Sequence, residues 1–174
     1  MKFNLIVTTF RNRENDAIVE LSNLISFLGD KEFMIETTTA SGVILCYSKI
    51  DPFVIVARSK SLVIAEPWQF RYILRIIPLE KNCLSNLYEF KKTIDSLRTK
   101  ISSSDTYKIQ IVKRFCHLRT SDIISNLARA VSNDVNLSNP DWIILIEIIG
   151  KWSGISIMKP DQIFSAVKEK RDFS

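Results

Sequence analysis

Four side chains that could hold an anion lie within a short segment of the chain: Lys113, Arg114, His117 and Arg119. The alternation before them predicts a strand over residues 107–116, and Ser121 is a candidate cap for a following helix. Cations at a strand end beside exposed helix amides form an anion site, because the amides position a phosphate and the cations hold it. The alternative is that these cations are only solvated at the strand end.

This cluster lies in the most basic part of the chain, whose net charge is +5. Residues 91–119 contain eight lysines and arginines against two acids, whereas residues 1–78 contain nine against eight. A local excess of six positive charges attracts phosphate, so Lys91 and Lys92 join the candidate contacts. A solvated basic face without a partner is the alternative.

Two further features could contact a nucleic acid. Arg71 and Arg75 are four residues apart in a predicted strand and therefore share a face, although this could simply be the polar face of a half-buried strand. We keep Arg75 as a supporting contact. Lys151 and Trp152 lie in a predicted turn, where the lysine could hold a phosphate and the tryptophan could stack on an unpaired base or pack against a neighbouring domain.

The sequence offers little for catalysis, metal binding or cofactor binding. His117 is the single histidine, and the three cysteines (Cys46, Cys83 and Cys116) form no CxxC pair, so we predict reduced intracellular thiols and no metal site. Four glycines cannot form a phosphate-cradling loop or a dinucleotide fingerprint. We therefore predict no cofactor and no enzymatic activity.

Residues 1–78 are predicted to form the first domain of an α+β protein, with the order βαββαβ of a ferredoxin-like half. We expect strands over residues 5–10, 33–37, 43–47 and 70–77, and helices over residues 12–28 and 52–60. Asp51 is the expected cap of the second helix, and Pro52 suits its first position. Pro78 marks the predicted domain boundary.

Residues 79–174 are predicted to form a second, α/β domain. The expected elements are a helix over 84–101, a strand over 107–116, a helix over 121–131, strands over 142–149 and 155–158, and a charged C-terminal helix that frays. The strand over 142–149 is apolar except at Glu147, which indicates burial on both faces. No apolar run approaches the ~20 residues that span a bilayer, and the N-terminus lacks the features of a signal peptide, so we predict a cytoplasmic protein without membrane contact.

The stretch Asn139-Pro140-Asp141-Trp142, followed by an apolar strand and by Gly154-Ile155-Ser156, resembles the C-terminal half of a THUMP domain. Over nearly its whole length the chain also resembles the tRNA acetylation adaptor family. The segments that carry this resemblance are residues 3–14, Asp51-Pro52-Phe53, residues 71–78, and Lys113-Arg114 ahead of residues 121–124.

The resemblance implies a non-catalytic adaptor that binds tRNA. In related enzymes the THUMP domain holds the acceptor-stem 3′ end, and the partner of the adaptor group is an RNA cytidine acetyltransferase that makes N4-acetylcytidine. The basic run lies within the THUMP part, so charge and resemblance indicate the same region. The alternative function is a protein-interaction subunit of an RNA-modification complex with little RNA affinity of its own, which predicts an exposed apolar patch.

Overall fold

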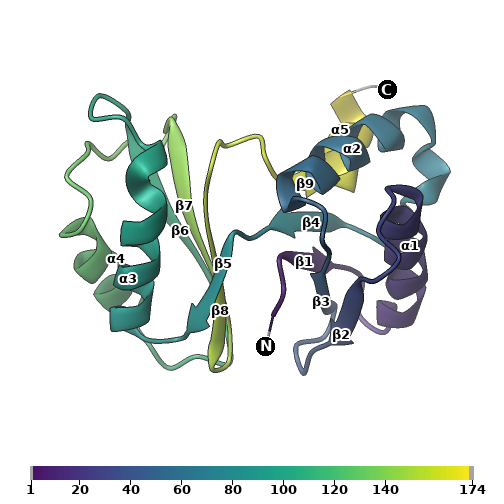
Figure 1. The fold of residues 1–174 in the computed structure, drawn as a ribbon, viewed down its shortest axis with the longest axis horizontal. Helices are drawn as coiled ribbons and strands as arrows, with labels where there is room; N and C mark the ends of the chain where they lie inside the picture. Colours follow the sequence, from purple (N-terminus) through teal and green to yellow (C-terminus); the bar gives the residue numbers. More distant parts are fainter. Residues whose placement is uncertain (1, 173–174) are drawn as a thin grey trace. The chain divides into compact units, whose positions relative to one another are not determined.

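The computed structural model describes residues 2–172, which form an α+β fold of two compact units. The first unit comprises residues 2–79 and 161–172, and the second unit comprises residues 80–160. Each unit has one β-sheet and one hydrophobic core (Figure 1). Each is described by itself below.

The first unit has five strands, three α-helices and a 3-10 turn in its described residues. They are β1 (Leu5–Thr8), α1 (Glu14–Phe27), β2 (Met34–Thr37), β3 (Val43–Tyr47), α2 (Pro52–Ala65), η1 (Pro67–Gln69), β4 (Arg75–Pro78), β9 (Phe164–Ser165) and α5 (Ala166–Asp172). The sheet order is β2-β3-β1-β4-β9, and all neighbouring strands are antiparallel. The strands and helices of residues 2–78 follow the predicted βαββαβ order.

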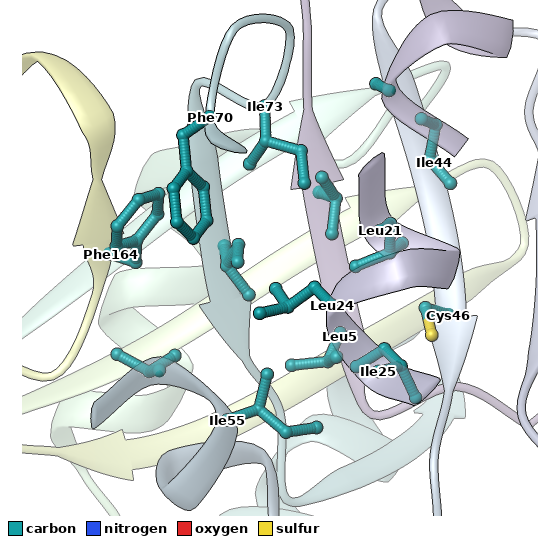
Figure 2. Packing of buried hydrophobic residues seen from close by; sticks show 14 of the residues in the cluster. Leu5, Leu21, Leu24, Ile25, Ile44, Cys46, Ile55, Phe70, Ile73 and Phe164 are labelled. Atoms are coloured by element: carbon teal, nitrogen blue, oxygen red, sulfur yellow. The ribbon is translucent and has the colours of Figure 1, made fainter. Parts of the chain in front are cut away.

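Helices α1 and α2 pack their apolar side chains against the sheet. Figure 2 shows Leu24 and Ile25 of α1, and Ile55 of α2, gathered around Leu5 of the central strand β1. Asp51 caps α2 as predicted, because its carboxylate accepts hydrogen bonds from the backbone N–H groups of the first turn. The helix extends to Ala65, beyond the predicted end at residue 60, because its apolar residues continue to face the core.

The predicted strand over residues 70–77 is wrong in its first half, since β4 begins only at Arg75. Arg71 therefore does not share a strand face with Arg75. The physical reason is the carboxylate of Glu20 on α1, which accepts hydrogen bonds from the backbone N–H groups of residues 71, 72 and 73. These amides are thereby satisfied outside the sheet.

The second unit has four strands covered on one face by two helices (Figure 1). Its elements are β5 (Lys81–Leu84), α3 (Leu87–Leu97), η2 (Arg98–Lys100), β6 (Tyr107–Arg114), α4 (Thr120–Ala128), β7 (Trp142–Ile149) and β8 (Trp152–Met158). The sheet order is β5-β8-β7-β6. Strands β6 and β7 are parallel, and the other neighbours are antiparallel. Phe90 and Ile94 of α3, with Ile123 of α4, pack on the apolar face of β7.

Two predicted elements of this unit differ from the structure. The long helix over 84–101 is split into β5, helix α3 and the turn η2, because the Asn86 side chain accepts a hydrogen bond from the backbone N–H of Glu89 and starts α3 there. Strand β8 begins at Trp152 rather than at Ile155, and Gly154 lies inside the ladder opposite Glu147.

The C-terminal segment forms the predicted short helix, α5, and the predicted fraying at residues 173–174 lies outside the described residues. The prediction also placed residues 79–174 in the second domain, which differs from the structure. Residues 161–172 belong to the first unit, where β9 pairs with β4 and Phe164 lies in the core. The rings of Phe164 and Phe70 lie 4.8 Å apart between centroids (Figure 2). The boundary itself falls between Leu79 and Glu80, next to the predicted position after Pro78. Within residues 2–172, no helix is long and apolar enough to cross a membrane.

Candidate nucleic-acid interface

A pocket lies in the second unit where the parallel strands β6 and β7 reach their carboxyl ends. Its volume is about 520 Å³, and its lining residues are Leu84, Ser85, Asn86, Phe115, Cys116, His117, Leu118, Gly150 and Lys151. None of these residues carries a carboxylate. Ligands of open α/β sheets commonly bind at the carboxyl ends of strands. We call this site the strand-end pocket.

Two hydrogen bonds constrain the loop after β6, one at its beginning and one at its end. The backbone N–H of Gly150 donates a hydrogen bond to the carbonyl of Arg114 (2.8 Å), and the Nζ of Lys113 donates to the carbonyl of Leu118 (2.7 Å). Between these points Phe115 adopts a left-handed backbone with a φ of +55°. The loop therefore holds residues 115–118 in a defined position along the strand-end pocket.

The β7–β8 turn supplies the other wall of the pocket. Ile149 pairs with Trp152, so only Gly150 and Lys151 connect the strands. Gly150 has a φ of +58°, a conformation that glycine adopts readily at the first position of a two-residue hairpin. The tight turn fixes the backbone of Lys151 beside the loop after β6.

Two of the predicted contacts, His117 and Lys151, line the strand-end pocket together. Both side chains are exposed. Lys151 supplies a positive charge, and the imidazole of His117 can donate a hydrogen bond to a phosphate oxygen. The structure thus brings together residues that are 34 positions apart in the sequence.

Arg114, also predicted as a phosphate contact, has a partner within the protein. Its Nη1 lies 2.7 Å from the Oε2 of Glu147, whose exposed fraction is 2%. A buried carboxylate without a cation is costly, so Arg114 compensates the charge of Glu147 in the centre of the sheet. Lys113 is exposed, and its ammonium holds the loop through the carbonyl of Leu118.

Arg119 lies at the start of α4, but the helix is not capped as predicted. The helix begins at Thr120 with Arg119 as the capping residue, and no side chain caps it, so Ser121 lies inside the first turn. The Nε of Arg119 lies 3.5 Å from the carboxylate of Asp122 in that turn. An acid at this helix end competes with an incoming phosphate, which weakens the predicted site at the α4 N-terminus.

The remaining predicted contacts lie outside the strand-end pocket. Lys91 and Lys92 are exposed on α3, where the Nζ of Lys91 pairs with the carboxylate of Asp95 at 2.8 Å. Arg75 is exposed on β4 and belongs to the first unit. Of these, Lys92 and Arg75 form no ion pair within residues 2–172.

The aromatic side chain at the pocket is Phe115, which sequence reasoning missed. Its exposed fraction is 64%, whereas Trp152, for which the sequence left base stacking and packing against a neighbouring domain open, is half-buried at the start of β8 opposite Leu84. The available signal was the position of a phenylalanine immediately after the Lys113-Arg114 pair. A strand that ends in cations is a poor place to continue a core.

The Asn-Pro-Asp-Trp stretch has a structural role at the opposite ends of β6 and β7. The Asp141 carboxylate accepts hydrogen bonds from the backbone N–H and the hydroxyl of Thr106, at 2.8 and 3.0 Å, and these bonds lower the pKa of Asp141. The indole N–H of Trp142 donates to Asp105 at 2.9 Å. The stretch therefore joins the beginnings of the two parallel strands and contributes no side chain to the strand-end pocket.

Within residues 2–172, no three side chains of His, Cys, Asp or Glu come together as a group that could hold a metal ion. Burial raises the pKa of the Cys46 thiol to about 12 and also raises that of Cys83. Cys116 is half-buried and lines the strand-end pocket.

The fold is similar to that of several larger proteins of known structure. PH1313 from Pyrococcus horikoshii Ot3 matches with a TM-score of 0.63 and 15% identity, covering 91% of this chain and 55% of that one. TrmN from Thermus thermophilus matches with a TM-score of 0.60 and 13% identity, over 90% of this chain and 45% of that one. A 4-thiouridine synthetase in complex with RNA and ATP matches with a TM-score of 0.50 and 14% identity, covering 94% of this chain and 42% of that one.

Residues 85–158 match the family model of the THUMP domain. The chain is also 29% identical, over 119 residues, to THUMP domain-containing protein 1 of Bos taurus. This match covers 60% of the chain, which spans about a third (33%) of the length of that curated relative. The second unit thus contains a THUMP domain, as the sequence predicted. Except for Leu84, the strand-end pocket lies within the matched residues.

Proposed function

We propose that this chain is a non-catalytic adaptor that binds tRNA through its THUMP domain and presents it to a modification enzyme. The observation that carries the proposal is the strand-end pocket: a concave site without acids, with a lysine and an imidazole on its walls and an exposed aromatic ring. Nucleic-acid backbones need cations and hydrogen-bond donors, whereas unpaired bases need an aromatic or apolar surface. The pocket offers both.

In this function Lys151 and His117 contact the phosphates of an unpaired RNA segment, such as the acceptor-stem 3′ end of a tRNA. Lys92 and Arg119 are exposed on the same unit and extend the positive field to the neighbouring duplex. Because Arg114 is bound to Glu147, its role is to hold the end of β6 rather than to take up a phosphate.

The test is a titration of the protein with intact tRNA and with tRNA whose 3′ single-stranded end has been removed, at low and at moderate salt. We expect salt-sensitive binding that weakens on trimming. Lys151→Ala should weaken binding and lower the slope of log K against log salt by roughly 0.7, the contribution of one phosphate contact in a single strand. Lys31→Ala removes the same charge from the first unit, outside the pocket, and is the matched control. Equal salt slopes for wild type and Lys151→Ala would refute this contact.

We further propose that the modification is N4-acetylation of cytidine and that the partner is an RNA cytidine acetyltransferase. The support is the resemblance of the sequence to the acetylation adaptors. The expected result is that acetylcytidine forms faster when this chain is added to the acetyltransferase and tRNA, and that the chain alone forms none. Turnover by the purified chain with an acetyl or methyl donor would overturn the non-catalytic assignment. We also infer that the first unit is ferredoxin-like, which its βαββαβ order and antiparallel sheet support.

One observation favours the alternative function, a protein-interaction subunit. The first unit carries a groove of about 460 Å³ lined by Phe27, Leu28, Arg58, Ser61, Leu62 and Ala65. Phe27 is 74% exposed, and Arg58 is the one charged lining residue, so the groove suits an apolar segment that carries an acid. In a pull-down with the acetyltransferase, Phe27→Ala should reduce capture and leave tRNA affinity unchanged. Undiminished capture would exclude this groove as the docking site.

A further inference from the structure

Phe115 has a conformation that its own packing does not explain. A φ of +55° is uncommon for a residue with a Cβ atom and is sterically unfavourable for a residue as bulky as phenylalanine. A phenylalanine usually offsets such a cost by burying its ring, but 64% of Phe115 is exposed. Strained residues that gain no packing cluster at ligand sites, where the surrounding structure holds them in position.

The surrounding structure does hold Phe115. The Gly150–Arg114 hydrogen bond fixes the backbone before it, and the Lys113–Leu118 hydrogen bond closes the loop after it. The backbone that carries the ring therefore does not need to be ordered by a ligand. Binding to a surface that is already ordered avoids the entropy of immobilising a loop.

The chemistry around the ring matches a single nucleotide. Leu84, 46% exposed, and Leu118 provide an apolar lining, while Lys151 and His117 provide a positive charge and a hydrogen-bond donor. No lining residue is acidic, and the volume of about 520 Å³ is in the range of pockets that hold small ligands. A base is flat, aromatic and uncharged, and its phosphate is anionic, so this combination fits a nucleotide better than an apolar peptide.

We propose that Phe115 is the stacking platform for one unpaired RNA base in the strand-end pocket, with Lys151 and His117 on the adjoining phosphate. This inference rests on the proposed RNA-binding function and assigns its base contact to a particular residue. Stacking accepts any base, so the pocket reads the presence of an unpaired nucleotide rather than its sequence.

The test compares Phe115→Asn and Phe115→Trp in the full chain. Asparagine tolerates the left-handed backbone, so Phe115→Asn removes the ring and leaves the loop conformation and the melting temperature unchanged. Its affinity for tRNA should fall roughly 5- to 100-fold, the effect of losing one stacked base, while the salt slope stays at the wild-type value. Phe115→Trp should bind as tightly as wild type. Trp68→Ala, which removes an aromatic ring of similar exposure (66%) from the first unit, should not change RNA affinity.

A direct probe is a short RNA oligonucleotide with the fluorescent base 2-aminopurine at its unpaired end. We expect its fluorescence to be quenched on binding to wild type and Phe115→Trp, and not on binding to Phe115→Asn. If wild-type protein binds tRNA and Phe115→Asn binds and quenches equally well, the stacking role is refuted while the proposed function stands. If wild-type protein does not bind tRNA at all, the proposed function fails and this inference fails with it.

Discussion

Replacing Phe164 by alanine should destabilise the first unit, although the residue lies only ten positions from the end of the sequence. Its side chain has no exposed surface and stacks at 4.8 Å on Phe70, with an interplanar angle of 41°. Strand β9 has two residues and pairs with β4 at only two positions, so backbone pairing alone holds it weakly. The ring therefore supplies a buried apolar contact that this short backbone pairing lacks.

The expected loss of stability is about 3–5 kcal/mol, the usual range for truncating a fully buried phenylalanine to alanine. Roughly 0.5–1.5 kcal/mol of this comes from the aromatic pair with Phe70. Domains of this size are stable by only about 5–15 kcal/mol, so the change removes a large share of the stability of the first unit. Phe90→Ala is the matched control, because Phe90 is equally buried in the core of the second unit.

The measurement is hydrogen exchange followed by mass spectrometry of peptides, combined with urea unfolding. Phe164→Ala should lower protection in peptides from β1, β4 and α2, whereas Phe90→Ala should lower it in peptides from α3, β7 and β8. A loss below about 0.5 kcal/mol, the size of an ordinary surface substitution, with unchanged protection of β1 and β4, would refute the assignment of the C-terminal segment to the first core.

Three further predictions concern other parts of the chain. Iodoacetamide should alkylate Cys116, which lines the strand-end pocket, before Cys46, because burial raises the pKa of Cys46 to about 12. Bound tRNA should slow the reaction of Cys116. Mass spectrometry measures both rates, and faster alkylation of Cys46 would contradict the prediction. Asp30→Asn should destabilise the fold at neutral pH, because hydrogen bonds to the Asp30 carboxylate, chiefly from the Ser48 hydroxyl, lower its pKa in the folded protein. This stabilisation is lost as the pH falls below about 4, the ordinary pKa of an aspartate. The difference in unfolding free energy between wild type and Asp30→Asn, measured with urea, should therefore decrease at acidic pH. Asp51→Ala should lower the unfolding free energy by about 0.5–2 kcal/mol in the same assay through loss of the α2 cap. Asp51→Asn should keep most of the wild-type stability, because asparagine also caps helices. Equal losses for both variants would show that the cap is not responsible.

Long elements with a regular pattern of apolar residues could be predicted from the sequence, whereas elements defined by distant contacts could not. Helix α1 and strand β7 are of the first kind, because their own residues show the pattern. The segment before Arg75 alternates like a strand, but the carboxylate of Glu20, some 50 positions away, takes up its amides. Strand β9 has two residues and exists only because Phe164 fits the first core, which no local pattern reveals.

The sequence predicted two polar residues of the strand-end pocket and missed its aromatic residue. His117 could be selected because it lies beside cations at a predicted strand end, and Lys151 because it lies in a predicted turn. The pairing of Arg114 was open to prediction as well, since the lone Glu147 in an apolar strand requires a buried cation. Phe115 was missed, because a phenylalanine in a sequence is usually interpreted as a core residue, and its position directly after the Lys113-Arg114 pair was the one signal against that interpretation.

The unit that is synthesised first is not the unit that is completed first, because the first unit contains segments from both sides of the second unit. The second unit is continuous from residue 80 to residue 160, so all of its residues are synthesised before the C-terminal segment of the first unit. The first unit is synthesised earlier but finished later, because β4 remains an open edge until residues 164–165 arrive. An open edge with a buried face beside it is a site for pairing with other chains. A chain truncated between the end of the second unit and Phe164 would therefore keep all residues of the second unit and lose the strand that covers the edge of β4, so its first unit would be prone to aggregation.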